Sequence, residues 1–226
     1  MILSGMKLAE IASVLQKDVV HLQRHVAGLH ADMESRHRRG GKGVLTQCGE
    51  YTSPGKVQWL YVVTISPVRT SLYPMAWYLT SEGIQGVQID AEGPMTLLRP
   101  HVLQRYRKRY CPEADILEAL RQLHWQNYDK ASELRIHKGQ PTIASAVEHG
   151  FLLGCLLYND SVMQVHTFYD VEMGMQDPEL RPMRKLLEWR RYYAAMAPKL
   201  NSSVTDRYMN WGHGFPLRLE RLRRAA

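Results

Sequence analysis

The sequence predicts an α+β protein with a mainly antiparallel sheet, helices packed on one face of that sheet, and a long amphipathic helix at the N-terminus. Two observations predict this class. Apolar residues recur at helical spacing at the start, in the middle and towards the end of the chain, and segments rich in aromatic and β-branched residues lie between them. The resulting order of helix, strands, helix pair, strands and helix is typical of helices covering one face of a mainly antiparallel sheet.

The first predicted element is one long amphipathic helix over residues 4–33, with Ser4 as its N-cap. Its apolar residues recur at intervals of three and four: Leu8, Ile11, Leu15, Val19, Leu22, Val26 and Leu29. The stretch LAEIASVL allows a DNA-reading helix-turn-helix, but the pattern continues without the break that a turn requires, so a packing or oligomerising helix is favoured. His21 and His25 lie four residues apart on this helix and, without an evident third ligand, indicate a solvated face rather than a metal site.

The middle of the chain predicts an antiparallel meander over residues 44–98. Its segments 57–65 and 75–80 are rich in aromatic and β-branched residues, and turn-forming residues separate them. Before this meander, the basic and glycine-rich stretch 35–43 predicts a loop. Arg38 and Arg39 in that loop are candidates for contacting nucleic-acid phosphates.

The second half of the chain predicts two helices, a group of strands and a last helix. In order, these are helices over 101–110 and about 113–128, strands over 142–169 with a hairpin-type turn at Asn159-Asp160-Ser161, and a helix over 178–197. We therefore expect three parts: an N-terminal amphipathic helix (1–34), an α+β core (44–198) and a basic C-terminal tail (199–226).

Composition restricts the class of partner. The 226 residues carry a formal net charge of +7, which favours polyanionic partners, with nucleic acid first and an anionic membrane surface second. Three widely spaced cysteines fit neither a disulfide framework nor a zinc pattern, and together with the lack of a secretory signal they predict a cytoplasmic protein. No window is apolar enough for a membrane span, and no P-loop, Rossmann, GxSxG or HExxH motif occurs, so no cofactor or metal is expected.

A histidine followed by arginines at steps of four marks the segment LLRPHVLQRYRKRY. His101, Arg105 and Arg109 fall on one face of the predicted helix, since each step of four residues turns about 40°. A histidine can move a proton near neutral pH, and guanidinium groups stabilise charge on a phosphate. The segment therefore predicts a phosphodiester site, with a solvated basic helix as the alternative. The neighbouring basic residues are candidates for nucleic-acid binding: Arg99, Arg107 and Lys108.

The strand QVHTFYD offers partners for this helix. Strand alternation puts Thr167 and Tyr169 on one face and His166 with Asp170 on the other, so His166 and Thr167 can share a site only if the strand is bulged. His149, beside a glycine at the end of an earlier strand, is a further candidate for acid–base chemistry.

Together, PHVLQRYRKRY and VHTFYD resemble the RelE/barnase/EndoU/colicin-type ribonuclease toxin fold over about residues 95–170. The resemblance implies metal-independent RNA cleavage, and so RNA rather than DNA as the partner. It also implies that His101, Arg105 and Arg109 line the site and that Thr167 or Tyr169 faces them. Pro100 stands where many members of that group have a serine, and the segments outside 95–170 have no counterpart in it.

Three functions follow as hypotheses. The first is a toxin-type endoribonuclease, a hydrolase that acts on RNA, in which His101 is the general acid or base and Thr167, Tyr169 and His149 orient the substrate. The second is a non-catalytic nucleic-acid-binding accessory protein of phage or mobile-element origin, in which Tyr106 and Tyr110 can stack bases between arginines. The third is a structural protein that forms a homo-oligomer or binds a partner through residues 4–33.

Overall fold

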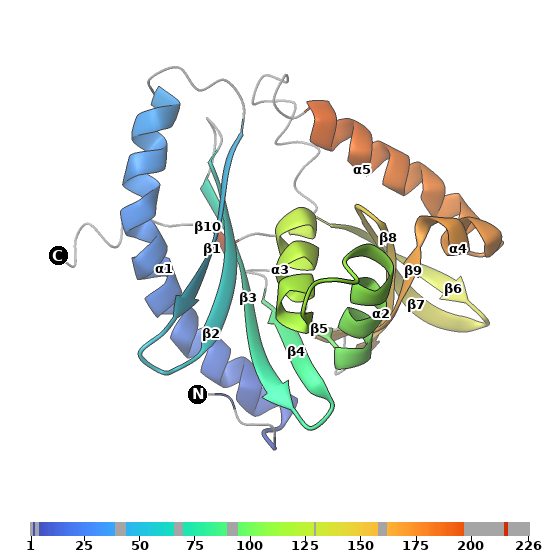
Figure 1. Ribbon diagram of the computed structural model, residues 1–226, viewed down its shortest axis with the longest axis horizontal. Coiled ribbons are helices and arrows are strands. Elements are labelled where there is room, and N and C mark those ends of the chain that lie inside the picture. The colour runs from blue at the N-terminus through green and yellow to red at the C-terminus, as the bar shows by residue number, and fades with distance from the viewer. Residues whose placement is uncertain are drawn as a thin grey trace.

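The computed structural model describes residues 2, 5–38, 44–65, 70–89, 95–128, 130–157, 162–196 and 215–216. Its centre is one sheet in the order β1-β2-β3-β4-β5-β9-β8-β7-β6, with β10 paired to β3 (Figure 1). The strands are β1 (Leu45–Thr52), β2 (Gln58–Ile65), β3 (Thr70–Thr80), β4 (Gly83–Gln88), β5 (Met95–Leu98), β6 (Ala131–His137), β7 (Gln140–Val147), β8 (Gly150–Leu157), β9 (Val162–Asp170) and β10 (Phe215–Pro216). Among these strands every pairing is antiparallel except that of β5 with β9. The predicted α+β class and mainly antiparallel sheet are confirmed.

Helix α1 (Leu8–Arg38) lies against β1, β2 and β3 on one face of the sheet (Figure 1). Its apolar stripe is buried there, because Leu15, Leu22 and Val26 are each 0% exposed. The buried carboxylate of Asp18 fixes the helix to the turn between β1 and β2. It accepts hydrogen bonds from the Ser53 hydroxyl and the Trp59 indole, both at 2.8 Å. The long N-terminal helix is confirmed, although it begins at Leu8 and continues into the stretch predicted as a loop.

Helices α2 (Pro100–Tyr110) and α3 (Ile116–Asn127) cover the opposite face. Adjacent strand residues show the division, since Trp59 packs under α1 whereas Leu60 packs with α2 and α3. Beyond β9, α4 (Val171–Gln176), the 3-10 turn η1 (Arg181–Met183) and α5 (Arg184–Met196) pack on the α1 side, against Phe151 and Leu153. The helices therefore divide between both faces, where one face was predicted, because strands such as β2 and β8 bury side chains on both sides.

Two further differences have local causes. Pro178 and Pro182 interrupt the helix predicted over 178–197, because proline lacks the amide that a helix interior needs, and η1 stands between α4 and α5. Strand β6 was not predicted, since its exposed Leu134 and Ile136 lie at the edge of the sheet. The predicted turn at Asn159-Asp160-Ser161 and the tail other than β10 lie outside the described residues.

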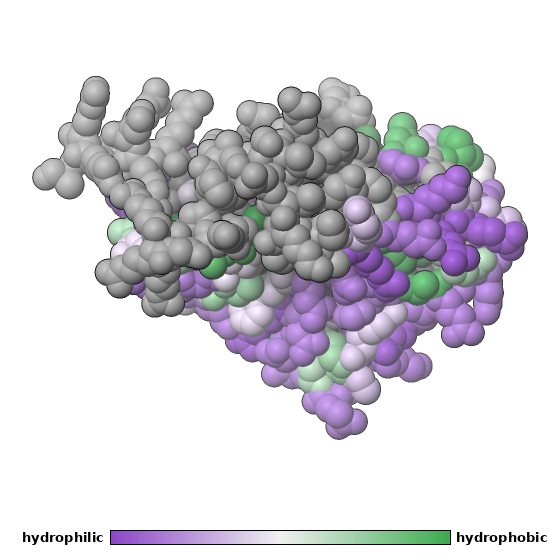
Figure 2. Space-filling view, turned by 90° about the horizontal axis from the view of Figure 1, so that it is seen from above, coloured by the Kyte–Doolittle hydropathy of each residue, from purple (hydrophilic) through white to green (hydrophobic). Residues whose placement is uncertain are grey.

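The described surface in Figure 2 is mainly hydrophilic, with small hydrophobic areas between the polar ones. None of the helices in the described ranges is long and apolar enough to cross a membrane.

Candidate functional site at helix α2 and strand β9

The candidate site begins where β5 passes into α2. Strand β5 runs parallel to β9, and Leu98 is paired with Val165. Arg99 and His166 therefore follow this pair at the same end of the two strands. Arg99 is the N-cap of α2 and makes no side-chain capping bond. Pro100 follows at the first helical position, where a missing amide costs nothing. Arg99 and His101 therefore lie at the carboxyl end of β5, beside β9.

Strand β9 carries a bulge at His166. Leu153 pairs with Thr167 and Gly154 pairs with Val165, which leaves His166 as the extra residue. The glycine is needed because a Cβ on Gly154 would lie 2.2 Å from the carbonyl oxygen of Gln164. Strand alternation requires a bulge if His166 and Thr167 are to share a site, and the structure contains a bulge at this position.

Beside the bulge, one basic side chain of α2 bonds to β9, and the charges of Arg99 and His101 act on His166. The Arg105 guanidinium donates a hydrogen bond to the Thr167 hydroxyl. Burial lowers the pKa of His166 below its ordinary value of 6.5, and the positive charges of Arg99 and His101 lower it further. The neutral form of His166 is therefore favoured at pH 7. Its Nε2 atom lies 3.0 Å from the Cys155 sulfur on β8.

Arg109 lies along β9 as well but is already engaged by the protein. Its Nη1 donates to the carbonyl oxygen of Phe168 at 2.9 Å, and its Nε lies 3.6 Å from Oδ2 of Asp170. The guanidinium also lies over the Phe168 ring, 5.9 Å from its centre. These contacts fix the end of α2 to β9, so Arg109 is a positioning residue for the site.

His149 belongs to a neighbouring aromatic group rather than to the site. Its ring stacks on Tyr110 with centroids 4.4 Å apart, and the Tyr110 hydroxyl donates to the His149 carbonyl oxygen. Its Nε2 lies 3.1 Å from Oε1 of Gln126. Burial lowers the pKa of His149, and the charges of Arg191 and Arg190 lower it further against the effect of Glu148. Tyr106 is fully buried, which excludes its predicted use in stacking bases.

The remaining predicted site residues are spread more widely. Tyr169 packs with Phe151 on the other face of β9, so it does not face His101. Arg99 forms an exposed ion pair with Glu82 at 3.5 Å, Lys108 is exposed and Arg107 is half-buried. Arg38 is the last residue of α1, and Arg39 lies outside the described residues.

Sequence reasoning committed neither His166 nor Cys155 to the site. His166 was weighed as a partner of Asp170 and, if the strand is bulged, of Thr167, whereas Cys155 was considered only as one of three widely spaced cysteines. Gly154 opposite QVH was the available signal, since a glycine inside a strand indicates a bulge or a close backbone approach. Cys48, Cys111 and Cys155 are all free thiols.

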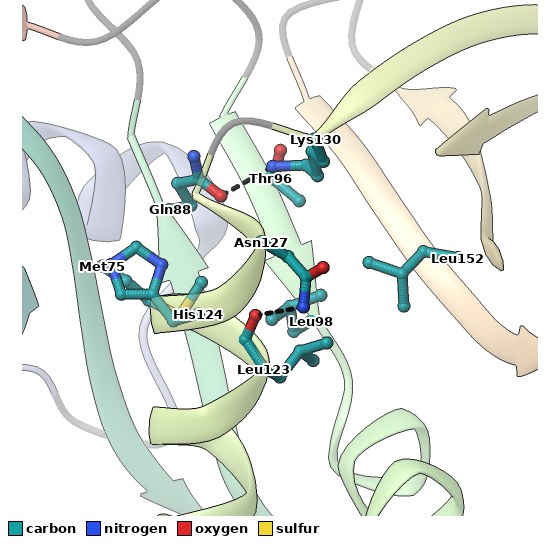
Figure 3. Close-up of a pocket in the computed structure, with 9 residues that line it drawn as sticks. All are labelled: Met75, Gln88, Thr96, Leu98, Leu123, His124, Asn127, Lys130 and Leu152. Atoms are coloured by element: carbon teal, nitrogen blue, oxygen red, sulfur yellow. Dashed lines mark hydrogen bonds between the residues drawn. The ribbon is translucent and has the colours of Figure 1, made fainter. Parts of the chain in front are cut away.

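A separate small pocket lies between α3, β5 and β8 (Figure 3). It measures about 10 Å³, which is room for one water molecule and too little for a substrate. Its wall includes His124, which is 2% exposed. Its lining residues are Met75, Gln88, Thr96, Leu98, Leu123, His124, Asn127, Lys130 and Leu152.

No family model, no curated protein and no solved structure matches this chain.

Proposed function

We propose that this protein binds RNA and cleaves it without a metal ion at the surface formed by His101, Arg105, His166, Thr167 and Arg99. The observation that carries the proposal is the bulge at His166 in β9, which is near enough to the start of α2 for the charges of Arg99 and His101 to act on its imidazole. Two histidines and two arginines at one surface supply the groups that phosphodiester cleavage requires.

The chemistry assigns a role to each group. His166, whose pKa is lowered, takes the proton of the ribose 2′-hydroxyl as a general base. The 2′-oxygen then attacks phosphorus, the bond to the 5′-oxygen breaks, and His101 gives that oxygen its proton. The products are a 2′,3′-cyclic phosphate and a 5′-hydroxyl end. Arg105 and Arg99 bind the phosphate oxygens, since a guanidinium has five N–H donors and Thr167 takes only one from Arg105.

The proposal keeps part of the predicted site and changes the rest. His101, Arg105 and Thr167 retain their predicted places, whereas Arg109 positions β9 and Tyr169 faces away. The resemblance to the ribonuclease toxin fold supports the same activity, and the net charge of +7 supports a polyanionic substrate. A toxin role accords with this activity. A cytoplasmic location accords with the free thiols.

The test is RNA cleavage in EDTA. Mixed RNA and a panel of short single-stranded RNAs are incubated with the wild type and with His101→Ala, His166→Ala and His21→Ala. We expect each of the first two variants to lose at least about 100-fold in rate, the usual contribution of a general acid or base. His21→Ala, on α1, should retain the wild-type rate. Equal cleavage by His101→Ala and wild type overturns the assigned mechanism.

RNA binding without cleavage is the second candidate function. The contacts of Arg105 with Thr167 and of Arg109 with Phe168 favour this function, because they fix the two guanidinium groups on β9. Each guanidinium can still bind phosphate through its other N–H groups. It predicts binding that weakens steeply with salt, no products in the cleavage assay, and loss of affinity in Arg105→Ala but not in His101→Ala. The third hypothesis, pairing through residues 4–33, has less support because the apolar stripe of α1 is buried against its own sheet.

A further inference from the structure

We propose that His137, Asp177 and Glu179 bind a divalent transition-metal ion such as Zn²⁺. His137 is the last residue of β6, and the two acids lie in the connection between α4 and η1. In the described part of the chain this is the group of three ligand-type side chains whose donor atoms all lie within 4.8 Å of one another. The site is separate from the proposed RNA site and does not depend on it.

The spacing of the donor atoms fits a small ion. Nε2 of His137 lies 3.0 Å from Oδ2 of Asp177 and 4.0 Å from Oε2 of Glu179. In a tetrahedral zinc site with bonds of 2.0–2.2 Å, neighbouring ligand atoms are about 3.4 Å apart. Both distances therefore differ from that spacing by well under 1 Å, which rotation of the carboxylates can supply.

Backbone amides hold the two carboxylates in place. Glu179 accepts a hydrogen bond from the amide of Lys138 at 2.5 Å, and Asp177 accepts one through Oδ1 from the amide of Glu179 at 2.9 Å. Such bonds orient ligands before an ion arrives and leave Oδ2 of Asp177 facing the imidazole.

The donor set selects the class of metal. One imidazole with two carboxylates suits Zn²⁺, Co²⁺ or Mn²⁺, whereas Mg²⁺ and Ca²⁺ take oxygen ligands alone and Cu⁺ prefers sulfur. The side chain of Glu179 is 44% exposed while that of His137 is 11% exposed, so the site opens to solvent on one side. Water can complete the coordination there. The ion would replace the hydrogen bond between His137 and Asp177.

The position of the site indicates a structural role. It connects the tip of the β6–β7 hairpin, at the edge of the sheet, to the segment between α4 and η1. Strand β6 of that hairpin exposes Leu134 and Ile136 at 63% and 61%, so these two side chains add little apolar packing. The His137 ring is 6.2 Å from that of Tyr169, which points away from α2. The ion would therefore lie on the other face of β9 from His101 and would stabilise the hairpin.

The test is a titration of the full chain, purified without a histidine tag and treated with EDTA, with ZnCl₂ in a calorimeter. We expect one ion per chain with micromolar affinity, and a rise in the melting temperature on adding Zn²⁺. Asp177→Asn and Glu179→Gln should each weaken binding by about 100-fold. The double variant His21→Gln/His25→Gln, which removes the two histidines that lie four residues apart on α1, should leave binding unchanged.

Substitution of Co²⁺ identifies the ligands directly. A tetrahedral cobalt spectrum without a thiolate charge-transfer band is expected, and it should disappear in His137→Gln. Glu179 is partly exposed, so Glu179→Gln keeps the test valid if the His137 variant fails to fold. The proposal is overturned if the folded wild type gives no heat of Zn²⁺ binding and no tetrahedral Co²⁺ spectrum. It is also overturned if Asp177→Asn and Glu179→Gln bind the ion as tightly as the wild type. RNA cleavage in EDTA is a separate readout, so either proposal can fail alone.

Discussion

His124 is a histidine that the fold keeps neutral. Its Nε2 lies 3.1 Å from the carbonyl oxygen of Tyr73, so that nitrogen carries the proton. Burial and then the charge of Lys130 lower the pKa of His124 from 6.5 to about 3, although the bond to Tyr73 opposes them. Between these two values the unfolded chain binds a proton that the folded chain does not. The contribution to stability is therefore complete above pH 6.5 and is lost as the pH falls towards 3.

This linkage gives a prediction for His124→Gln, which cannot titrate. Urea unfolding at several pH values between 7 and 4 should show the free energy of unfolding of the wild type falling more steeply than that of the variant. The difference in slope should approach about 1.4 kcal/mol per pH unit below pH 6. Comparing slopes removes the pH-independent cost of the smaller side chain. Parallel curves for the two proteins would contradict a neutral, buried His124.

At the scale of elements, the bulge between β8 and β9 carries the candidate site. Pattern reasoning reached α2 because His101, Arg105 and Arg109 follow the helical period, and it identified β9 from its β-branched and aromatic residues. It named the bulge only as the condition for His166 and Thr167 to share a site, because an extra residue is defined by the partner strand, and Gly154 lies a hairpin away from His166. Strand β6 was not predicted because it lies at the edge of the sheet and buries few apolar side chains, so its composition is only a weak signal of a strand.

Gly154→Ala tests whether the bulge is required. The new Cβ would lie 2.2 Å from the Gln164 carbonyl oxygen, so β8 and β9 must separate, at a cost of about 1–3 kcal/mol. We expect this loss in chemical denaturation, together with weaker RNA cleavage or binding. The matched control is Gly28→Ala in α1, where no atom lies within 4 Å of the added Cβ and the change should stabilise the protein by about 0.5–1 kcal/mol. Wild-type stability and activity in Gly154→Ala would show that the bulge tolerates a side chain.

At the scale of the whole molecule, the sequence predicts the class and order of elements but not how the two halves join. The two antiparallel groups of strands meet through the parallel pair β5 and β9, whose residues Leu98 and Val165 are far apart in the chain. Nothing in either segment specifies that partner, because a parallel pairing depends on the chain between them. The same pairing explains why the helices cover both faces: each strand near the join buries side chains on both sides.

Because the cores share strands, we predict that the described fold unfolds as one unit. Trp59 lies in the core under α1, and its neighbour Leu60 lies in the core under α2 and α3; Leu97 and Leu98 divide in the same way. Losing one core would therefore expose the back of the other. In urea, tryptophan fluorescence, which includes buried Trp59, and far-ultraviolet circular dichroism should give one transition with coincident midpoints. Two separated transitions would instead show that α1 and its face of the sheet are independent of the half that carries His101 and His166.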